Sequence, residues 1–156
     1  MTDKPYDSLK DTVDHINNVR QKLYRLVNDF LDRALMHDMS KTISPEKDGY
    51  DKYSQSLRTL EYGSQEYKDT LLEMKPFIDH HYSLNSHHPE YYRDGINGMN
   101  LLDLLEMVCD WKAAGERHIE KPTSIVQSIE INAKRFEIDE QLKQILLNTV
   151  CYLDWV

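Results

Sequence analysis

The sequence is short of cysteine, glycine and proline. Its 156 residues include two cysteines, five glycines and five prolines. Cys109 and Cys151 each stand in an apolar helical pattern, so we expect no disulfide framework and a reducing, cytoplasmic setting. Stretches of strictly alternating polar and apolar residues, which are typical of strands, are also hard to find. These shortages favour an all-α chain.

Positive charge is the second shortage. Lysine and arginine number 19 against 27 aspartates and glutamates, which gives a net charge of −8, and no basic run occurs. A nucleic-acid polymer is therefore not an expected partner, because such binding depends on clustered lysine and arginine. The apolar runs are far shorter than the ~20 residues of a membrane span, and the polar start is unlike a signal peptide. We expect a cytoplasmic protein without a membrane partner, whose oligomeric state the sequence leaves unknown.

Apolar residues recur instead at helical spacing, every three or four positions. The first such stripe comprises Val13, Ile16, Val19, Leu23, Leu26 and Phe30. The residues Pro122, Thr123 and Ser124 predict a helix start with a capping hydroxyl. We predict a single all-α domain over residues 1–156, with six to seven helices near 7–27, 29–38, 47–60, 65–84, 99–117, 123–134 and 138–153.

Histidine is abundant: four of the seven stand between positions 80 and 88. An apolar stripe at helical spacing continues into His81, Asn85 and His88, so buried imidazoles are expected there. Buried ring nitrogens need partners, and a metal ion would supply one. We therefore predict His81 and His88 as ligands, with His80 and His87 on a neighbouring stripe as supporting residues or alternative ligands. A solvated histidine-rich turn is the competing interpretation.

A second candidate is the adjacent pair His37 and Asp38, because an imidazole and a carboxylate at a helix end can bind one ion. His15 lies 37 − 15 = 22 positions earlier. In one straight helix the two histidines would be about 33 Å apart, so a shared ion requires a turn between them. Asn28–Asp29 is the best candidate for that turn. The alternative is one long helix with His15 exposed.

The third candidate is a row of carboxylates in an otherwise apolar segment. Asp103, Glu106 and Asp110 follow at i, i+3 and i+7, which places them on one helix face. Three like charges repel one another and would be costly to bury. Cations or histidines opposite them would offset that cost. We therefore expect these carboxylates to face the histidines.

The order of His15, His37–Asp38 and Asp103 resembles the H…HD…D ligand set of the HD-domain superfamily of metal-dependent phosphohydrolases. More closely, HDxSK at 37–41, HHYxxNxHHPE at 80–90 and DLLEMxxDW at 103–111 resemble a small uncharacterised family found in bacteriophages and bacteria. The resemblance implies a single HD-domain-like helical bundle, in the bacterial host cytoplasm if phage-encoded. It supplies no established substrate.

The resemblance also implies a site. Its metal ligands would be His15, His37, Asp38, His81, His88 and Asp103, with Asp38 bridging two ions and with His80, His87, Glu90 and Asp110 as supporting residues or alternative ligands. One or two divalent ions of Mn, Fe, Co, Ni or Zn would be bound per chain. Asp38, Lys41 and Glu106 would be catalytic, Lys41 by pairing with a phosphate oxygen and Glu106 by orienting a ligand or accepting a proton.

The implied reaction is hydrolysis of a nucleotide or another small phosphoester. Two alternatives stay open. One is a di-iron oxygenase of the same superfamily, because imidazole and carboxylate ligands suit iron equally well. The other is a non-enzymatic, phage-encoded module that binds a nucleotide or a protein.

Overall fold

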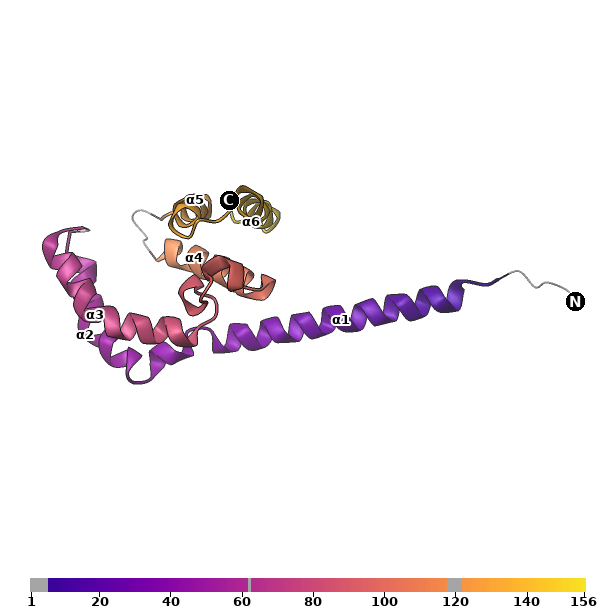
Figure 1. Ribbon diagram of the computed structural model, residues 1–156, viewed down its shortest axis with the longest axis horizontal. Coiled ribbons are helices and arrows are strands. Elements are labelled where there is room, and N and C mark those ends of the chain that lie inside the picture. The colour runs from indigo at the N-terminus through magenta and orange to yellow at the C-terminus, as the bar shows by residue number, and fades with distance from the viewer. Residues whose placement is uncertain (1–5, 62, 118–121) are drawn as a thin grey trace, which may run out of the picture. The chain divides into compact units, whose positions relative to one another are not determined.

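The computed structural model describes residues 6–61, 63–117 and 122–156, and in these ranges it contains six α-helices and no strand. This confirms the all-α prediction. Three short 3₁₀ turns connect the helices: η1 (Met39–Thr42), η2 (Pro89–Tyr91) and η3 (Gly95–Gly98). The α-helices are α1 (Leu9–Met36), α2 (Glu46–Thr59), α3 (Gln65–Leu84), α4 (Leu101–Glu116), α5 (Ile125–Arg135) and α6 (Glu140–Tyr152) (Figure 1).

The described chain divides into two compact units, one ending at His37 and one beginning at Asp38. The single domain over residues 1–156 that the sequence predicts stays a prediction. The first unit consists mainly of α1, which runs for 28 residues without interruption. The predicted turn at Asn28–Asp29 is therefore wrong. The segment 9–36 contains neither glycine nor proline, and an asparagine inside a helix costs only a few tenths of a kcal/mol, about 0.7 at most.

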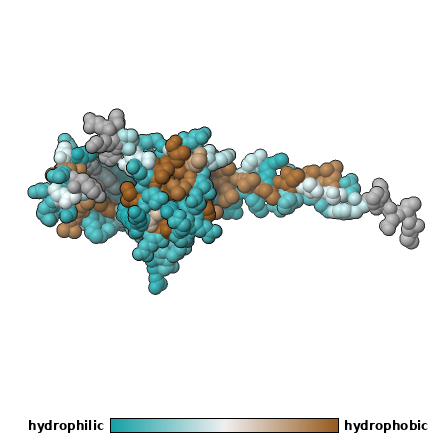
Figure 2. Space-filling view, turned by 90° about the horizontal axis from the view of Figure 1, so that it is seen from above, coloured by the Kyte–Doolittle hydropathy of each residue, from teal (hydrophilic) through white to brown (hydrophobic). Residues whose placement is uncertain are grey.

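The helix α1 is amphipathic. Apolar and polar side chains both line it in Figure 2. The apolar ones include the predicted stripe from Val13 to Phe30. Among the described residues, no helix combines the length and the apolar character that crossing a membrane requires.

The core of the second unit lies between α4, α5 and α6. It is built from Val108 on α4 together with Ile125, Ile129, Ala133, Ile138, Leu146 and Val150. Ser124 caps α5 by accepting a hydrogen bond from the backbone N–H of Gln127, so the predicted cap is confirmed. Cys109 and Cys151 are both free thiols at exposed positions. This core fixes α4, which carries the predicted carboxylate row.

The helices α2 and α3 form a closely packed pair (Figure 1). Gly49 on α2 makes the contact possible, because a Cβ there would lie 2.7 Å from Cβ of Phe77 on α3 and closer still to its ring. Tyr53, one turn further along α2, meets the same ring with centroids 6.2 Å apart. The pair brings the first turn of α2 beside the last turn of α3.

We expect Gly49→Ala to destabilise the protein by about 1–3 kcal/mol, since overpacking forces side chains or backbone to shift. An alanine elsewhere in a helix would instead stabilise by about 1 kcal/mol relative to glycine, so the sign of the change is informative. Urea unfolding followed by circular dichroism measures it. Gln55→Ala, at an exposed position of the same helix, should stay within about 0.5 kcal/mol of wild type. A more stable Gly49→Ala variant would contradict the close packing of α2 on α3.

Candidate metal site

Four side chains of the second unit converge where α3 ends and η1 begins. Asp38 directly precedes η1, His81 lies on the last turn of α3, and His87 and His88 follow before η2. The Nε2 atoms of His81 and His88 are 2.9 Å apart. Asp38 Oδ1 lies 3.3 Å from Nε2 of His81 and 3.6 Å from Nε2 of His87. The ligand atoms of the four residues all lie within 4.8 Å of one another.

These separations fit ligands of a single ion. Nitrogen ligands 2.0–2.1 Å from a tetrahedral ion lie about 3.3 Å from each other. The measured separations of 2.9, 3.3 and 3.6 Å span that value. The group of Asp38, His81, His87 and His88 can therefore hold a metal ion.

The backbone at Asp38 turns the carboxylate toward the histidines. Asp38 adopts the left-handed conformation, with φ 58° and ψ 12°, which aspartate tolerates better than most residues. Such strained positions cluster at functional sites. Its second oxygen, Oδ2, accepts a hydrogen bond from Lys41 Nζ at 2.6 Å. The carboxylate thus faces the histidines on one side and Lys41 on the other.

The orientation of His81 is set by Glu46. The His81 ring is 1% exposed, and its Nδ1 lies 2.8 Å from Oε2 of Glu46, which is itself fully buried. Glu46 also accepts hydrogen bonds from Ser40 Oγ and from His80 Nδ1, at 2.8 and 2.9 Å. Burial raises the pKa of Glu46, but these hydrogen bonds outweigh it and hold that pKa below the ordinary value. An ionised Glu46 accepts the Nδ1 proton of His81, so Nε2 presents its lone pair to the cluster.

His87 is held in the same way from α4. Its ring is 2% exposed, and its Nδ1 lies 3.2 Å from Oε1 of Glu106. Carboxylates that accept the outer proton of a ligand histidine are typical of metal sites. Glu106, predicted as catalytic, thus lies behind His87 as a positioning residue. His87, predicted as a supporting residue or an alternative ligand, directs Nε2 into the cluster.

The surroundings keep His88 and His81 neutral. Burial, followed by the neighbouring His87 and His81, lowers the pKa of His88 to about 3. Burial and the charge of Lys41 also lower the pKa of His81. Neutral imidazole is the form that binds metal. Both rings are thus in the ligand form near pH 7.

Asp103 is not placed as the sequence predicts. Its fully buried carboxylate accepts hydrogen bonds from Ser86 Oγ at 2.7 Å, Tyr92 OH at 2.6 Å and the backbone N–H of Asn100 at 2.9 Å. It is not among the converging ligand groups of the described chain. Its two oxygens are engaged in joining the segment around residues 86–92 to the start of α4, so we assign it a positioning role in place of the predicted ligand role.

Asp110, the alternative to Asp103 as a ligand, lies near the cluster. One of its carboxylate oxygens is within 4.8 Å of a ligand atom of Asp38. It lies two turns further along α4 than Asp103, on the same helix face, as its spacing predicts. Of the two carboxylates between which the sequence left the choice, Asp110 is therefore the one near the cluster.

His15 cannot join the site in the same chain. The unbroken α1 separates it from His37 by about 33 Å, and Asp38 directly follows His37. No imidazole reaches over that distance, so the prediction that His15 and Asp38 share an ion is corrected. His37 is the C-cap of α1 and belongs to the first unit. Its ligand role stays a prediction.

Two other predicted residues lie beside the cluster. His80 has a side chain that is 39% exposed and interacts with Glu46, and its supporting role stays a prediction. Glu90 instead accepts a hydrogen bond from Arg135 Nη2 at 2.9 Å. Glu46 escaped prediction altogether, since an acidic residue in a first helical turn is ordinarily explained by the helix dipole.

Comparison with known proteins adds a family but no activity. No curated protein and no solved structure matches the chain. A family model described as a family of unknown function, DUF5662, matches residues 4–151. The match takes in α1, the converging histidines and α4, so the whole candidate site lies inside the region that defines the family. The chain belongs to this family of unknown function, DUF5662.

Proposed function

We propose that the chain is a metal-dependent phosphohydrolase that acts on a nucleotide or another small phosphoester. The observation that carries the proposal is the convergence of ligand atoms from three histidines and one carboxylate, all within 4.8 Å of one another. Glu46 and Glu106 support two of those imidazoles from behind. Imidazole and carboxylate donors suit Mn, Fe, Co, Ni or Zn. The adjacent His37 and Asp38, which belong to the resemblance to HD-domain phosphohydrolases, agree with this proposal.

A divalent ion bound there would polarise a phosphoryl oxygen and lower the pKa of a bound water. In this proposal Lys41 holds the phosphate. Its Nζ contacts Asp38 Oδ2 and lies 5.3 Å above the Tyr50 ring, and its side chain is 26% exposed. It can therefore exchange the Asp38 oxygen for a phosphate oxygen, and its charge offsets the charge that develops on phosphorus oxygens during hydrolysis.

Asp110 and Tyr50 complete the proposed machinery. Asp110, whose carboxylate lies within 4.8 Å of the Asp38 ligand atom, is our candidate for the proton acceptor from the attacking water. The pKa of Tyr50 is raised by burial and then by the negative charges of Asp38 and Glu46. Its phenol thus stays protonated and can donate a hydrogen bond, but it does not serve as a base.

We propose one ion for the four-residue cluster. The binuclear site implied by the resemblance would need Asp38 to bridge two ions through both of its oxygens. Here Oδ1 faces the histidines while Oδ2 is 2.6 Å from Lys41. A cation already lies where the second ion would bind, so metal stoichiometry distinguishes the two arrangements.

The test is metal removal followed by reconstitution. Protein dialysed against a chelator should show no hydrolysis of phosphomonoesters, nucleoside triphosphates or cyclic nucleotides. Adding Mn²⁺, Fe²⁺, Co²⁺, Ni²⁺ or Zn²⁺ singly should restore activity with one ion per chain, counted by mass spectrometry of the metal. The Co²⁺ form should absorb in the visible as a tetrahedral ion does. Full activity after chelation, or no hydrolysis with any ion, would overturn the proposal.

The same samples separate the alternatives. Two irons per chain, a mixed-valent iron signal and oxygen uptake would identify an oxygenase. Nucleotide binding that is unchanged by chelation, without turnover, would identify a binding module. Either result replaces the hydrolase proposal.

A further inference from the structure

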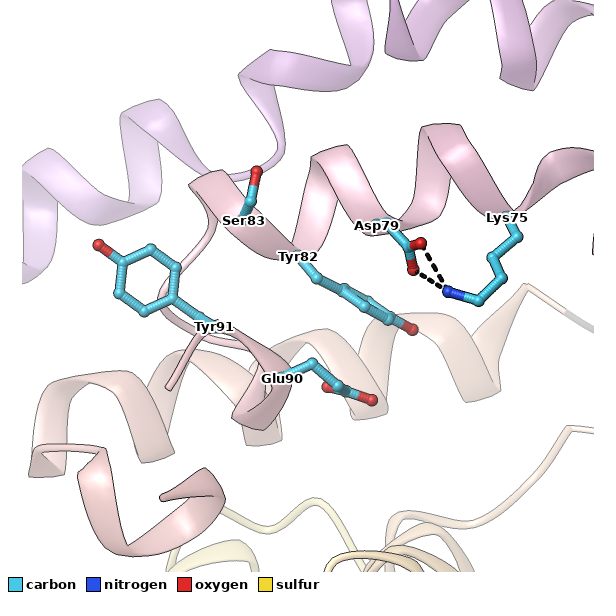
Figure 3. Close-up of a pocket in the computed structure, with 6 residues that line it drawn as sticks. All are labelled: Lys75, Asp79, Tyr82, Ser83, Glu90 and Tyr91. Carbon is cyan, nitrogen blue, oxygen red and sulfur yellow. Dashed lines mark hydrogen bonds and ion pairs between the residues drawn. The ribbon is translucent and has the colours of Figure 1, made fainter. Parts of the chain in front are cut away.

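A cavity of about 610 Å³ lies between α3 and η2, next to the metal site. Its lining consists of Lys75, Asp79, Tyr82 and Ser83 from α3 and Glu90 and Tyr91 from η2 (Figure 3). The volume falls inside the range of roughly 300–1,000 Å³ that is usual for small-molecule sites. None of the four converging ligands of the metal site lines it. The cavity is therefore a separate compartment that could take a different part of a substrate.

The ring of Tyr82 connects the cavity to the metal site. It is part of the cavity lining, and its centroid lies 4.8 Å from that of the His88 ring. The next residue toward the N-terminus is His81, another of the converging ligands. A molecule that stacks on Tyr82 would therefore lie one side chain away from the proposed ion.

The cavity lining carries two carboxylates, Asp79 and Glu90, beside the ammonium of Lys75 and the hydroxyl of Ser83. Figure 3 shows the side chains of Tyr82, Asp79 and Glu90 extending to the same side, whereas the Tyr91 ring extends to the other. Asp79 pairs with Lys75 at 2.6 Å, and Glu90 pairs with Arg135 at 2.9 Å. The charges of Lys75 and Arg135 are thus already neutralised by carboxylates. The cavity suits a phosphate poorly and suits a planar group with N–H donors well.

We propose that this cavity binds the base of a nucleotide, and that it selects bases carrying an exocyclic amino group, while the phosphate lies at the metal site. The inference rests on the proposed phosphohydrolase function and names its substrate class. Aromatic side chains stack on any base, and carboxylates accept hydrogen bonds from the amino group of cytosine. Uracil presents a carbonyl oxygen at that position, which a carboxylate repels.

Binding of nucleosides without phosphate tests the cavity directly. Titration of the Zn²⁺-loaded protein with cytidine and uridine, followed by NMR, should show cytidine bound about fivefold more tightly or better. Tyr82→Leu should weaken cytidine binding about tenfold with metal content unchanged, while Tyr82→Phe, which keeps the ring, should retain it. Glu90→Gln should reduce the preference for cytidine over uridine. The matched controls Tyr152→Leu and Glu140→Gln alter a tyrosine 87% exposed and a glutamate side chain 79% exposed on α6.

The outcomes separate this inference from the function on which it rests. Equal binding of the two nucleosides, or cytidine binding that survives Tyr82→Leu, would overturn the cavity assignment even if p-nitrophenyl phosphate is hydrolysed. Selective cytidine binding without hydrolysis of any phosphoester would leave the cavity assignment standing and overturn the hydrolase. If both hold, Tyr82→Leu should raise KM for a cytidine nucleotide more than it lowers kcat.

Discussion

A His87→Ala variant is expected to bind its metal ion at least about a hundredfold more weakly than wild type. Removing a residue that merely supports a ligand costs 10–100-fold, and His87 is itself a ligand in the proposed site. Its Nε2 lies 3.6 Å from Asp38 Oδ1, and Glu106 holds its other nitrogen. Competition with a chelating dye measures the affinity. The proposed phosphohydrolase activity, measured at limiting metal, should fall with the affinity.

His15→Ala is the matched comparison, because the HD resemblance makes His15 a ligand and the structure does not. The residue lies on the uninterrupted α1, about 33 Å from His37. Metal affinity and activity should both equal those of wild type. If His15→Ala loses the ion while His87→Ala keeps it, the ligand assignment made from the structure is wrong.

The second large effect is expected for Asp103→Ala, which should lower the free energy of unfolding by about 3 kcal/mol. The carboxylate is fully buried and accepts from Ser86, Tyr92 and the Asn100 backbone. Each buried donor left without an acceptor costs roughly 1–3 kcal/mol. Urea unfolding of the metal-free protein measures the loss apart from any contribution of the ion.

Two further variants serve as controls for Asp103→Ala. Asp103→Asn keeps one carbonyl acceptor and should lose less stability than Asp103→Ala. Asp94→Ala alters an exposed aspartate that makes no capping hydrogen bond, and it should stay within about 0.5 kcal/mol of wild type. If Asp103→Ala keeps its stability without metal but no longer binds metal, Asp103 is a ligand as the sequence predicts.

Helices α2 to α6 were predictable because their signals are local. Their ends lie within two residues of the predicted ranges. The cap at Ser124 shows why: a hydroxyl before an apolar periodic run determines the start of a helix within a few positions. The false break at Asn28–Asp29 has the opposite cause. A residue that caps well also fits inside a helix when the apolar spacing continues through it. Whether the helix breaks there depends on the helix propensity of the whole segment.

The site was predictable in residue types more than in roles. Helical spacing paired His81 with His88, but α3 ends at Leu84, so the periodicity no longer applies to the residues beyond it and His87 turns inward as well. The sequence did contain a sign of the structural role of Asp103, since Asn100 three positions earlier forms a capping box with it. Nothing in the sequence marked Glu46, because its burial depends on α3 packing against α2.

The spacing of the converging ligands along the chain also determines what an ion would do for the fold. Three of them come from one short stretch, positions 81–88, whereas Asp38 comes from 81 − 38 = 43 residues earlier. An ion held by both would act as a cross-link that closes a loop containing α2 and most of α3. The entropy removed from the unfolded chain by such a closure grows with the length of the loop. The ion that would activate a phosphate would thereby also restrain more than a quarter of the chain.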